Sequence, residues 1–264
     1  MRDLLRAIYA YRLFILSSIK NELHLRFVRS KLGALWIVIH PLMQVLIFAL
    51  ILSEVLSAKL PGIDNKYAYA LYLMAGTMCW ALFSDTVSKG LQLFIDNGNL
   101  MKKMAFPRVC LPLIAAGTTL VNNLMLLVAI LIVFACLGHI PDLHMLWLPV
   151  LIGITLMLAL GLGLLLGTMN VFMRDIGQVV PVVLQALFWL TPVVYNVDIL
   201  PQRLQFWFKL NPLYPLVTSY QNIMVYGKPP LWGDLAILVG ISILLLAVSL
   251  VVFRRASPEM VDVL

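Results

Sequence analysis

Residues 143–173 read LHMLWLPVLIGITLMLALGLGLLLGTMNVFM and contain no Asp, Glu, Lys or Arg. About 20 apolar residues in a helix suffice to cross the hydrocarbon core of a bilayer. This stretch is longer than that. It therefore predicts a membrane-spanning helix whose ends extend into the interfaces or into loops.

The composition of the whole chain agrees with this stretch. Of the 264 residues, 62% are hydrophobic and only 12% are charged, and the mean hydropathy is +0.98. A soluble domain carries about a quarter charged residues. So little charge does not cover a water-exposed surface, which excludes a soluble enzyme and predicts an integral membrane protein.

Other charge-free stretches are also long enough, or nearly so, to cross a bilayer. Together with 143–173 they predict six transmembrane helices and an all-α fold. The chain is expected to form one membrane domain over 1–264, with a cytoplasmic segment 1–31, a six-span region 32–253 and a tail 254–264. The five further stretches are 32–53, 67–84, 109–141, 176–197 and 235–253.

A seventh charge-free run has a different character. Residues 211–227 read NPLYPLVTSYQNIMVYG and include two prolines, two asparagines and a glutamine. In lipid these polar groups would lack partners. The run therefore predicts short re-entrant or interfacial helices, packed against protein on the outer side before the last span.

The basic residues orient the chain. An even number of spans puts both termini on one side, and Lys and Arg accumulate on the cytoplasmic side. Fourteen of the 19 Lys and Arg residues fall on the side of the termini, which is therefore predicted to be cytoplasmic; the formal charge of +7 reflects this topology rather than binding to nucleic acid. The other five are Lys59, Lys66, Arg203, Lys209 and Lys228.

The first 31 residues predict a basic amphipathic helix in the cytoplasmic interface. An ordinary solvated helix is the alternative. One face would carry apolar residues and the opposite face basic ones, and Arg12 interrupts the apolar face. The apolar residues are Leu5, Ile8, Ile15, Ile19 and Leu23, and the basic ones are Arg2, Arg6, Lys20 and His24.

The sequence shows no motif for nucleotide binding, catalysis or metal binding. No glycine-rich loop ends in Lys followed by Ser or Thr, so the chain has no ATP-binding P-loop. Gly163 and Gly167 form a GxxxG within a predicted span, which favours close helix packing. No catalytic or metal-binding constellation is apparent, so we expect no enzymatic activity and no metal. A membrane-embedded lipid-modifying enzyme would need a polar catalytic cluster.

Four segments together resemble a known family. They are RFVRSKLGALWIVIHPL (26–42), MKKMAFPRVCLPL (101–113), RDIGQVVPVVLQALFWLTPVVYN (174–196) and NPLYPLVTSYQNIMVYG (211–227). In this order they are similar to the membrane subunits of type-2 ABC exporters for polysaccharides, which serve O-antigen, capsule or teichoic acid. RDIGQVVP and TPVVYN resemble the O-antigen branch most. An exporter of a small molecule or drug is the alternative within the same class.

The resemblance implies an architecture and partners. It implies an interfacial helix at 4–30, a cytoplasmic coupling helix near 96–106 and two short outer helices near 200–226. It also implies a homodimer in the bacterial cytoplasmic membrane, joined by two separate ATPase subunits that bind ATP and Mg, with no cofactor in this chain. The dimer would line a channel for a polysaccharide carried on undecaprenyl diphosphate.

Three sets of residues are expected to carry this function. Trp80, Trp189 and Tyr195 would offer sugar rings flat surfaces along the channel, with Phe188 facing lipid, unless the rings only pack or form an interfacial belt. Arg26, Arg29 and Lys31 would meet the lipid diphosphate, unless they only anchor the topology. Leu100, Met101, Lys102 and Lys103 would contact the ATPase, unless they belong to an ordinary cytoplasmic loop.

Overall fold

The computed structural model describes residues 9–28, 35–36, 39–40, 42–43, 46–47, 68–103, 107–138, 142–197 and 201–263. Within these ranges every regular element is helical, which confirms the all-α fold. Short elements alternate with long helices. They are α2 (Arg12–Val28), α4 (Ala68–Asp96), α5 (Gly98–Lys103), α6 (Cys110–Cys136), the 3-10 helix η1 (Leu143–Trp147), α7 (Leu148–Phe172), α8 (Ile176–Trp189), α9 (Gln202–Lys209), α10 (Tyr214–Gln221), the π-helix η3 (Asn222–Tyr226) and α11 (Trp232–Val263).

Four of the described helices are long and apolar enough to cross a membrane. They cover Tyr69–Asp96, Cys110–Cys136, Leu143–Phe172 and Trp232–Met260, and they match four of the six predicted spans. The predicted first span, 32–53, lies almost wholly outside the described residues. The predicted fifth span contains α8, which is shorter.

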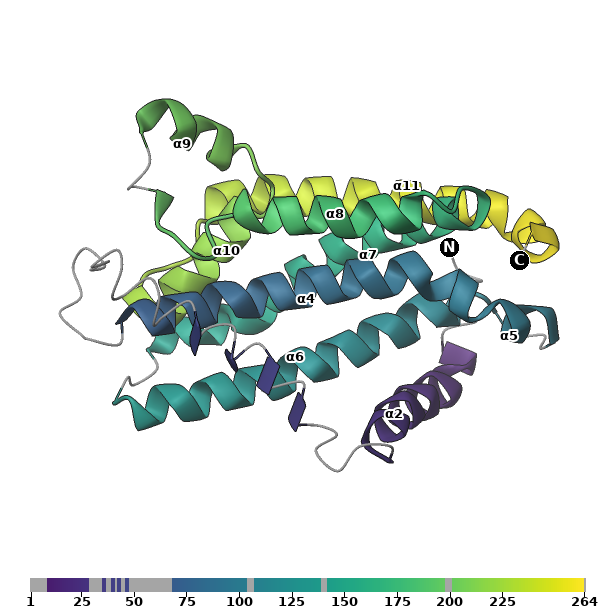
Figure 1. Cartoon of the computed structure of the whole chain (residues 1–264), viewed down its shortest axis with the longest axis horizontal. Helices are drawn as coiled ribbons and strands as arrows, with labels where there is room; N and C mark the ends of the chain where they lie inside the picture. The colour runs from purple at the N-terminus through teal and green to yellow at the C-terminus, as the bar shows by residue number, and fades with distance from the viewer. Residues whose placement is uncertain are drawn as a thin grey trace.

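The long helices run side by side (Figure 1). Helix α7 packs between α4 and α11, and α6 packs against α4 with α2 on its side. In the most apolar window of α4, 72% of the residues are buried, against 22% in α11. Helix α4 is therefore the centre of the bundle. We call its two extremities the Tyr69 end, where α9 and α10 lie, and the Asp96 end, where α5 and the last turns of α11 lie.

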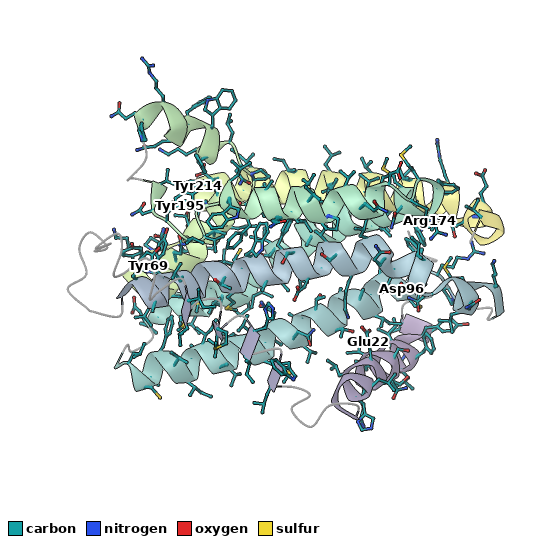
Figure 2. The ribbon with its side chains drawn as sticks, viewed as in Figure 1. Glu22, Tyr69, Asp96, Arg174, Tyr195 and Tyr214 are labelled. Carbon is teal, nitrogen blue, oxygen red and sulfur yellow. The ribbon has the colours of Figure 1, made fainter. Side chains whose placement is uncertain are left out.

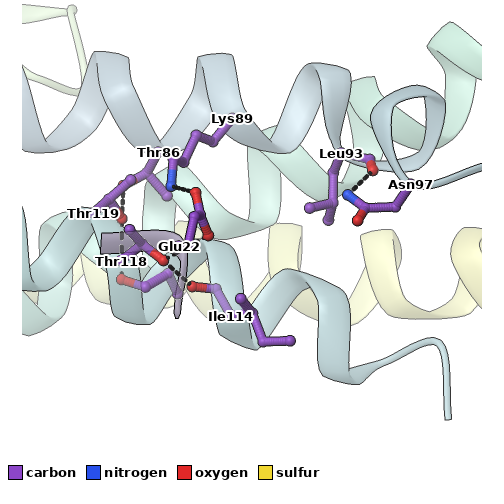
Figure 3. Close-up of polar contacts among 9 residues, drawn as sticks. Glu22, Thr86, Lys89, Leu93, Asn97, Ile114, Thr118 and Thr119 are labelled. Atoms are coloured by element: carbon purple, nitrogen blue, oxygen red, sulfur yellow. Dashed lines mark hydrogen bonds and ion pairs between the residues drawn. The ribbon is translucent and has the colours of Figure 1, made fainter. Parts of the chain in front are cut away.

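Helix α4 continues past its predicted end. We expected the span to stop at residue 84, because Asp85 follows, but the helix runs to Asp96. Its Lys89 ammonium lies 2.5 Å from a carboxylate oxygen of Glu22 in α2, and the Thr118 hydroxyl donates to the other oxygen at 2.9 Å (Figure 3). A charge is tolerated inside this long helix because α2 supplies its partner.

The described part of α2 packs one face on the bundle. Ile15 is buried and Ile19 lies against Gly117 of α6. Leu13, Leu16 and Leu25 are exposed. The predicted helical character is thus confirmed for the described part, and Ile15 and Ile19 of the predicted apolar stripe lie on the face that packs against the bundle. The earlier part of the predicted stripe, in residues 1–8, lies outside the described residues.

Glycines let α4 and α7 touch, as the GxxxG pattern predicted. A Cβ placed on Gly163 would lie 3.2 Å from the Thr86 carbonyl oxygen, and one on Gly90 would lie 2.7 Å from the Gly163 Cα. A Cβ on Gly167 would collide with the Gly90 carbonyl. The two backbones are therefore in direct contact, which only glycine permits.

We predict that Gly90→Ala lowers the thermal stability of the detergent-solubilised protein, because its methyl group meets backbone that has no room to move. Overpacking of this kind costs about 1–3 kcal/mol. The matched control is Gly153→Ala on α7, where the added Cβ has no atom within 4 Å. Thermal unfolding midpoints of the two variants should differ clearly; equal midpoints would contradict the packing argument.

Candidate functional site

Helix α8 does not continue through the predicted span 176–197. It ends at Trp189 and the chain then turns irregularly as far as Val197. Thr191, Pro192, Val193 and Val194 in this turn are nevertheless buried. Buried irregular backbone is tolerated at membrane depth only where protein groups satisfy its hydrogen bonds.

Side chains of α4 and α10 donate hydrogen bonds to the backbone carbonyl groups of this turn. The Tyr72 hydroxyl lies 3.1 Å from the Tyr195 carbonyl and 3.4 Å from the Pro192 carbonyl. The Gln221 amide donates to the same Pro192 carbonyl at 3.0 Å, and the Tyr69 hydroxyl donates to the Val194 carbonyl. The turn is thus fixed to the core at three carbonyls.

A groove of about 410 Å³ opens between α4 and α8. Its rings contact one another, with the centroids of Trp80 and Phe188 5.4 Å apart. Ser88 of α4 and Gln185 of α8 are exposed at this groove. A polar face on a membrane helix indicates a wet path or another protein rather than lipid. The groove is lined by Trp80, Ser84, Ser88, Pro181, Leu184, Gln185, Phe188 and Trp189.

The three ring residues predicted from the sequence come together here. Trp80 and Trp189 line the groove, and the Tyr195 hydroxyl donates to the Trp189 carbonyl. The prediction that Phe188 faces lipid is wrong: Phe188 is 8% exposed and Trp189 is 52% exposed. Phe188 lies four residues after Leu184, so both fall on the buried face of α8.

A second, smaller cavity lies at the Tyr69 end, beside the irregular turn, and measures about 290 Å³. Figure 2 shows Tyr195 and Tyr214 close to this end, and Glu22, Asp96 and Arg174 near the opposite end. Sequence reasoning missed this cavity, although four of its residues recur at every fourth position, a signal for one helix face. It is lined by Tyr72, Pro192, Asn196, Val197, Tyr214, Thr218, Gln221, Asn222, Tyr226 and Lys228.

The predicted coupling segment is in part helical. Helix α5 covers its middle, and Met101 is buried against Phe94 and Phe253 in a cluster with the end of α11. Leu100 is half-buried and Lys102 is exposed. Lys102 is therefore better placed than Leu100 or Met101 to contact a partner protein. The Lys103 side chain lies outside the described residues.

The residues predicted to contact the lipid diphosphate lie mostly outside the described part of the chain. Arg26 belongs to α2 by its backbone, but its side chain is outside the description, as are Arg29 and Lys31 entirely. Their role stays a prediction. Among the described residues, no group of three His, Cys, Asp or Glu side chains could hold a metal ion.

Comparison with known families decides the class of this membrane protein. The model of the ABC-2 type transporter family matches residues 15–225, which include α5, the whole groove and all residues that line the cavity except Tyr226 and Lys228. The chain belongs to the ABC-2 type transporter family. It is thus a membrane component of an ABC transporter, as the resemblance of its four segments implied.

Curated relatives of this ABC-2 chain extend over nearly its whole length. The O-antigen export system permease protein RfbA of Myxococcus xanthus is 29% identical over 264 residues, which cover 99% of both chains. A protein of the same name from Klebsiella pneumoniae is 27% identical and covers 97% of this chain and 96% of its own. The polysialic acid transport protein KpsM of Escherichia coli is 21% identical, over 91% of this chain and 92% of its own.

We predict that Tyr72→Phe destabilises this ABC-2 chain, because it leaves buried carbonyls of the turn short of a donor. A buried group without its hydrogen bond costs about 1–3 kcal/mol. The control is Tyr11→Phe, just before α2, where the side chain is exposed. Thermal unfolding in detergent should separate the two variants; an unchanged midpoint for Tyr72→Phe would show that the turn does not depend on this hydroxyl.

Proposed function

We propose that this chain is the channel-forming permease subunit of an ATP-driven exporter, which moves a polysaccharide linked to undecaprenyl diphosphate across the bacterial cytoplasmic membrane. O-antigen is the first candidate cargo, because two relatives that are 29% and 27% identical to this chain are named O-antigen export permeases. Capsular polysaccharide is the second, supported by the more distant polysialic acid relative. Teichoic acid and small molecules are the remaining alternatives.

The observation that carries this proposal is the groove between α4 and α8. It combines the exposed ring of Trp189 and the half-buried ring of Trp80 with uncharged polar groups, Ser84, Ser88 and Gln185. A sugar polymer offers apolar ring faces bordered by hydroxyls, which suits this combination. Fixed ion pairs or many strong hydrogen bonds would hold a sliding polymer in place, whereas successive sugars stack on rings with similar energy.

A second copy of the chain would complete the channel. The groove is open on one side, where Ser88, Gln185 and Trp189 are exposed. Lipid tails give no hydrogen bonds to Gln185. Two copies facing each other would enclose these side chains around an aqueous path, so we propose a homodimer with the groove at its interface.

The energy would come from partners. The sequence has no P-loop, so ATP and Mg would be bound by two separate ATPase subunits docked on α5. Because Met101 of α5 packs on Phe94 and Phe253, a displacement of α5 would reach α4 and α11 together. Alternating closure of the groove would follow from this movement.

The proposed orientation puts the Asp96 end and both termini in the cytoplasm. The predicted excess of Lys and Arg on that side supports it. Helices α9, α10 and η3 would then form the re-entrant segments on the outer side, and 32–53 would supply the first of six spans. Arg26, Arg29 and Lys31, at the cytoplasmic entry to that span, would bind the lipid diphosphate.

The groove is tested in cells that lack their own copy of the gene. The wild-type chain should restore surface polysaccharide, and Trp189→Ala should reduce it several-fold, because one ring contact is worth about 0.5–1.5 kcal/mol. Trp207→Ala on α9, 69% exposed and outside the groove, is the control. Normal surface polymer with a stably expressed Trp189→Ala variant would exclude the groove as the sugar path.

The partner surface is tested by reversing one charge. Lys102→Glu should weaken co-purification of the ATPase and lower export, because an ammonium group that meets acidic groups would then repel them. Lys209→Glu at the opposite end of the molecule is the matched control. Met101 is left unchanged in this test, because the replacement of its buried side chain would disturb the fold itself. Undiminished co-purification with Lys102→Glu would place the ATPase elsewhere.

A further inference from the structure

The cavity at the Tyr69 end has the size of a small-molecule site. Its volume of about 290 Å³ is near the lower end of the usual range of roughly 300–1,000 Å³. It shares no lining residue with the groove between α4 and α8. It lies between α4, the irregular turn and the pair α10–η3, at the end of the bundle where Figure 2 labels Tyr69, Tyr195 and Tyr214.

One continuous face of α10 and η3 forms a wall of this cavity. Tyr214, Thr218, Asn222 and Tyr226 follow at intervals of four residues, and all are half-buried. The last turn is a π-helix, a rare conformation that is frequent at functional sites. It ends at Gly227, whose φ of 58° few other residues adopt easily. The chain then brings Lys228 to the rim.

Three polar groups of this cavity are available to a ligand. In the part of the chain that the structure describes, the Thr218 hydroxyl and the Asn222 carboxamide make no hydrogen bond, and no carboxylate lies within ion-pair distance of the Lys228 ammonium. That ammonium lies 5.6 Å from the centre of the Tyr226 ring.

The nearest acid is already engaged. Asp142 approaches Gly227, but its carboxylate accepts from the Leu143 N–H at 2.7 Å and lies 2.7 Å from the His144 Nδ1. The hydrogen bonds from His144 and from the Leu143 N–H lower the pKa of this carboxyl group. Asp142 does not line the cavity, so Lys228 is its only charged residue.

The chemistry of the cavity selects among ligands. Tyrosine rings from three elements give flat apolar contact, while the Thr218 hydroxyl, the Asn222 carboxamide and the Lys228 ammonium give hydrogen bonds. A hydrocarbon ligand would leave those polar groups without partners at about 1–3 kcal/mol each. A pyranose has apolar faces and a rim of hydroxyls, and a carboxylate on it would pair with the ammonium.

We propose that this cavity binds one sugar unit of the exported glycan, and that Lys228 makes it favour an acidic sugar such as a uronic acid. The inference rests on the proposed function. Hydrogen bonds link the walls of the cavity and the groove: the Tyr72 hydroxyl donates to the Tyr195 carbonyl, and the Tyr195 hydroxyl donates to the Trp189 carbonyl. Groove and cavity are then successive sugar contacts along one path.

The test measures saturation transfer by NMR from the purified full-length chain, in detergent, to methyl β-glucuronide and methyl β-glucoside. We expect binding of the glucuronide with a Kd of about 1–10 mM, the weak range for one small ligand. Thr218→Val and Asn222→Leu, which keep the shape and remove the polar atoms, should each weaken it about tenfold. Lys228→Gln should abolish the preference for the glucuronide. Trp207→Leu, outside the cavity, is the control.

Each outcome has one meaning. Equal transfer to both glycosides would overturn the role of Lys228, and transfer that survives Thr218→Val and Asn222→Leu would overturn the site. Absence of binding to the wild-type chain would also overturn it, even if deletion of the gene removes surface polysaccharide, in which case the proposed function stands. The variants could weaken binding to the purified chain as expected while deletion of the gene leaves surface polysaccharide unchanged. This pair of results would instead keep the site and exclude the proposed function. Unchanged unfolding midpoints show that the variants are folded.

Discussion

The backbones of α4 and α7 touch at Gly90, Gly163 and Gly167, and the rest of the structure depends on that contact. Helix α4 contributes Trp80 and Ser84 to the groove, Tyr72 to the cavity and Lys89 to the ion pair with α2. Each of these positions depends on how closely α4 and α7 approach each other. Larger side chains at the contact would push the two helices apart and change the spaces around α4.

A second constraint acts at the Tyr69 end. The chain leaves helical geometry after Trp189, so its carbonyl groups need partners within the protein. The Tyr69 and Tyr72 hydroxyls and the Gln221 amide supply them. Because Tyr72 and Gln221 also line the cavity, the same side chains that make the turn possible shape the proposed binding site.

Hydropathy predicted four membrane helices correctly, because long apolar runs have few alternatives to a helix in lipid. It ended α4 too early, since a sequence window shows Asp85 and Lys89 but not Glu22 across the bundle. It made α8 too long, since the absence of charge after Trp189 does not reveal that buried tyrosines support a turn there.

The candidate site was predictable only in part. Trp80 and Trp189 were predicted as aromatic rings of membrane helices that line the sugar path, and the structure brings them to one groove. The rotation of α8 about its axis buries Phe188 and exposes Trp189. The sequence does not reveal this rotation, because the two residues are neighbours. The cavity joins Tyr72 to the face of α10, a pairing that depends on the tertiary fold alone.

The ion pair between Lys89 and Glu22 has a consequence for how the protein is made. The apolar helix Tyr69–Asp96 has 28 residues, about 42 Å at 1.5 Å per residue, so about 12 Å extends beyond a 30 Å hydrocarbon core. A lone lysine near the bilayer raises the free energy of insertion. Helix α2 precedes α4 in the chain and α6 follows it, so Lys89 gains Glu22, itself held by Thr118, only once all three helices have packed. The lysine of the central helix is thereby paired by assembly and not by insertion alone.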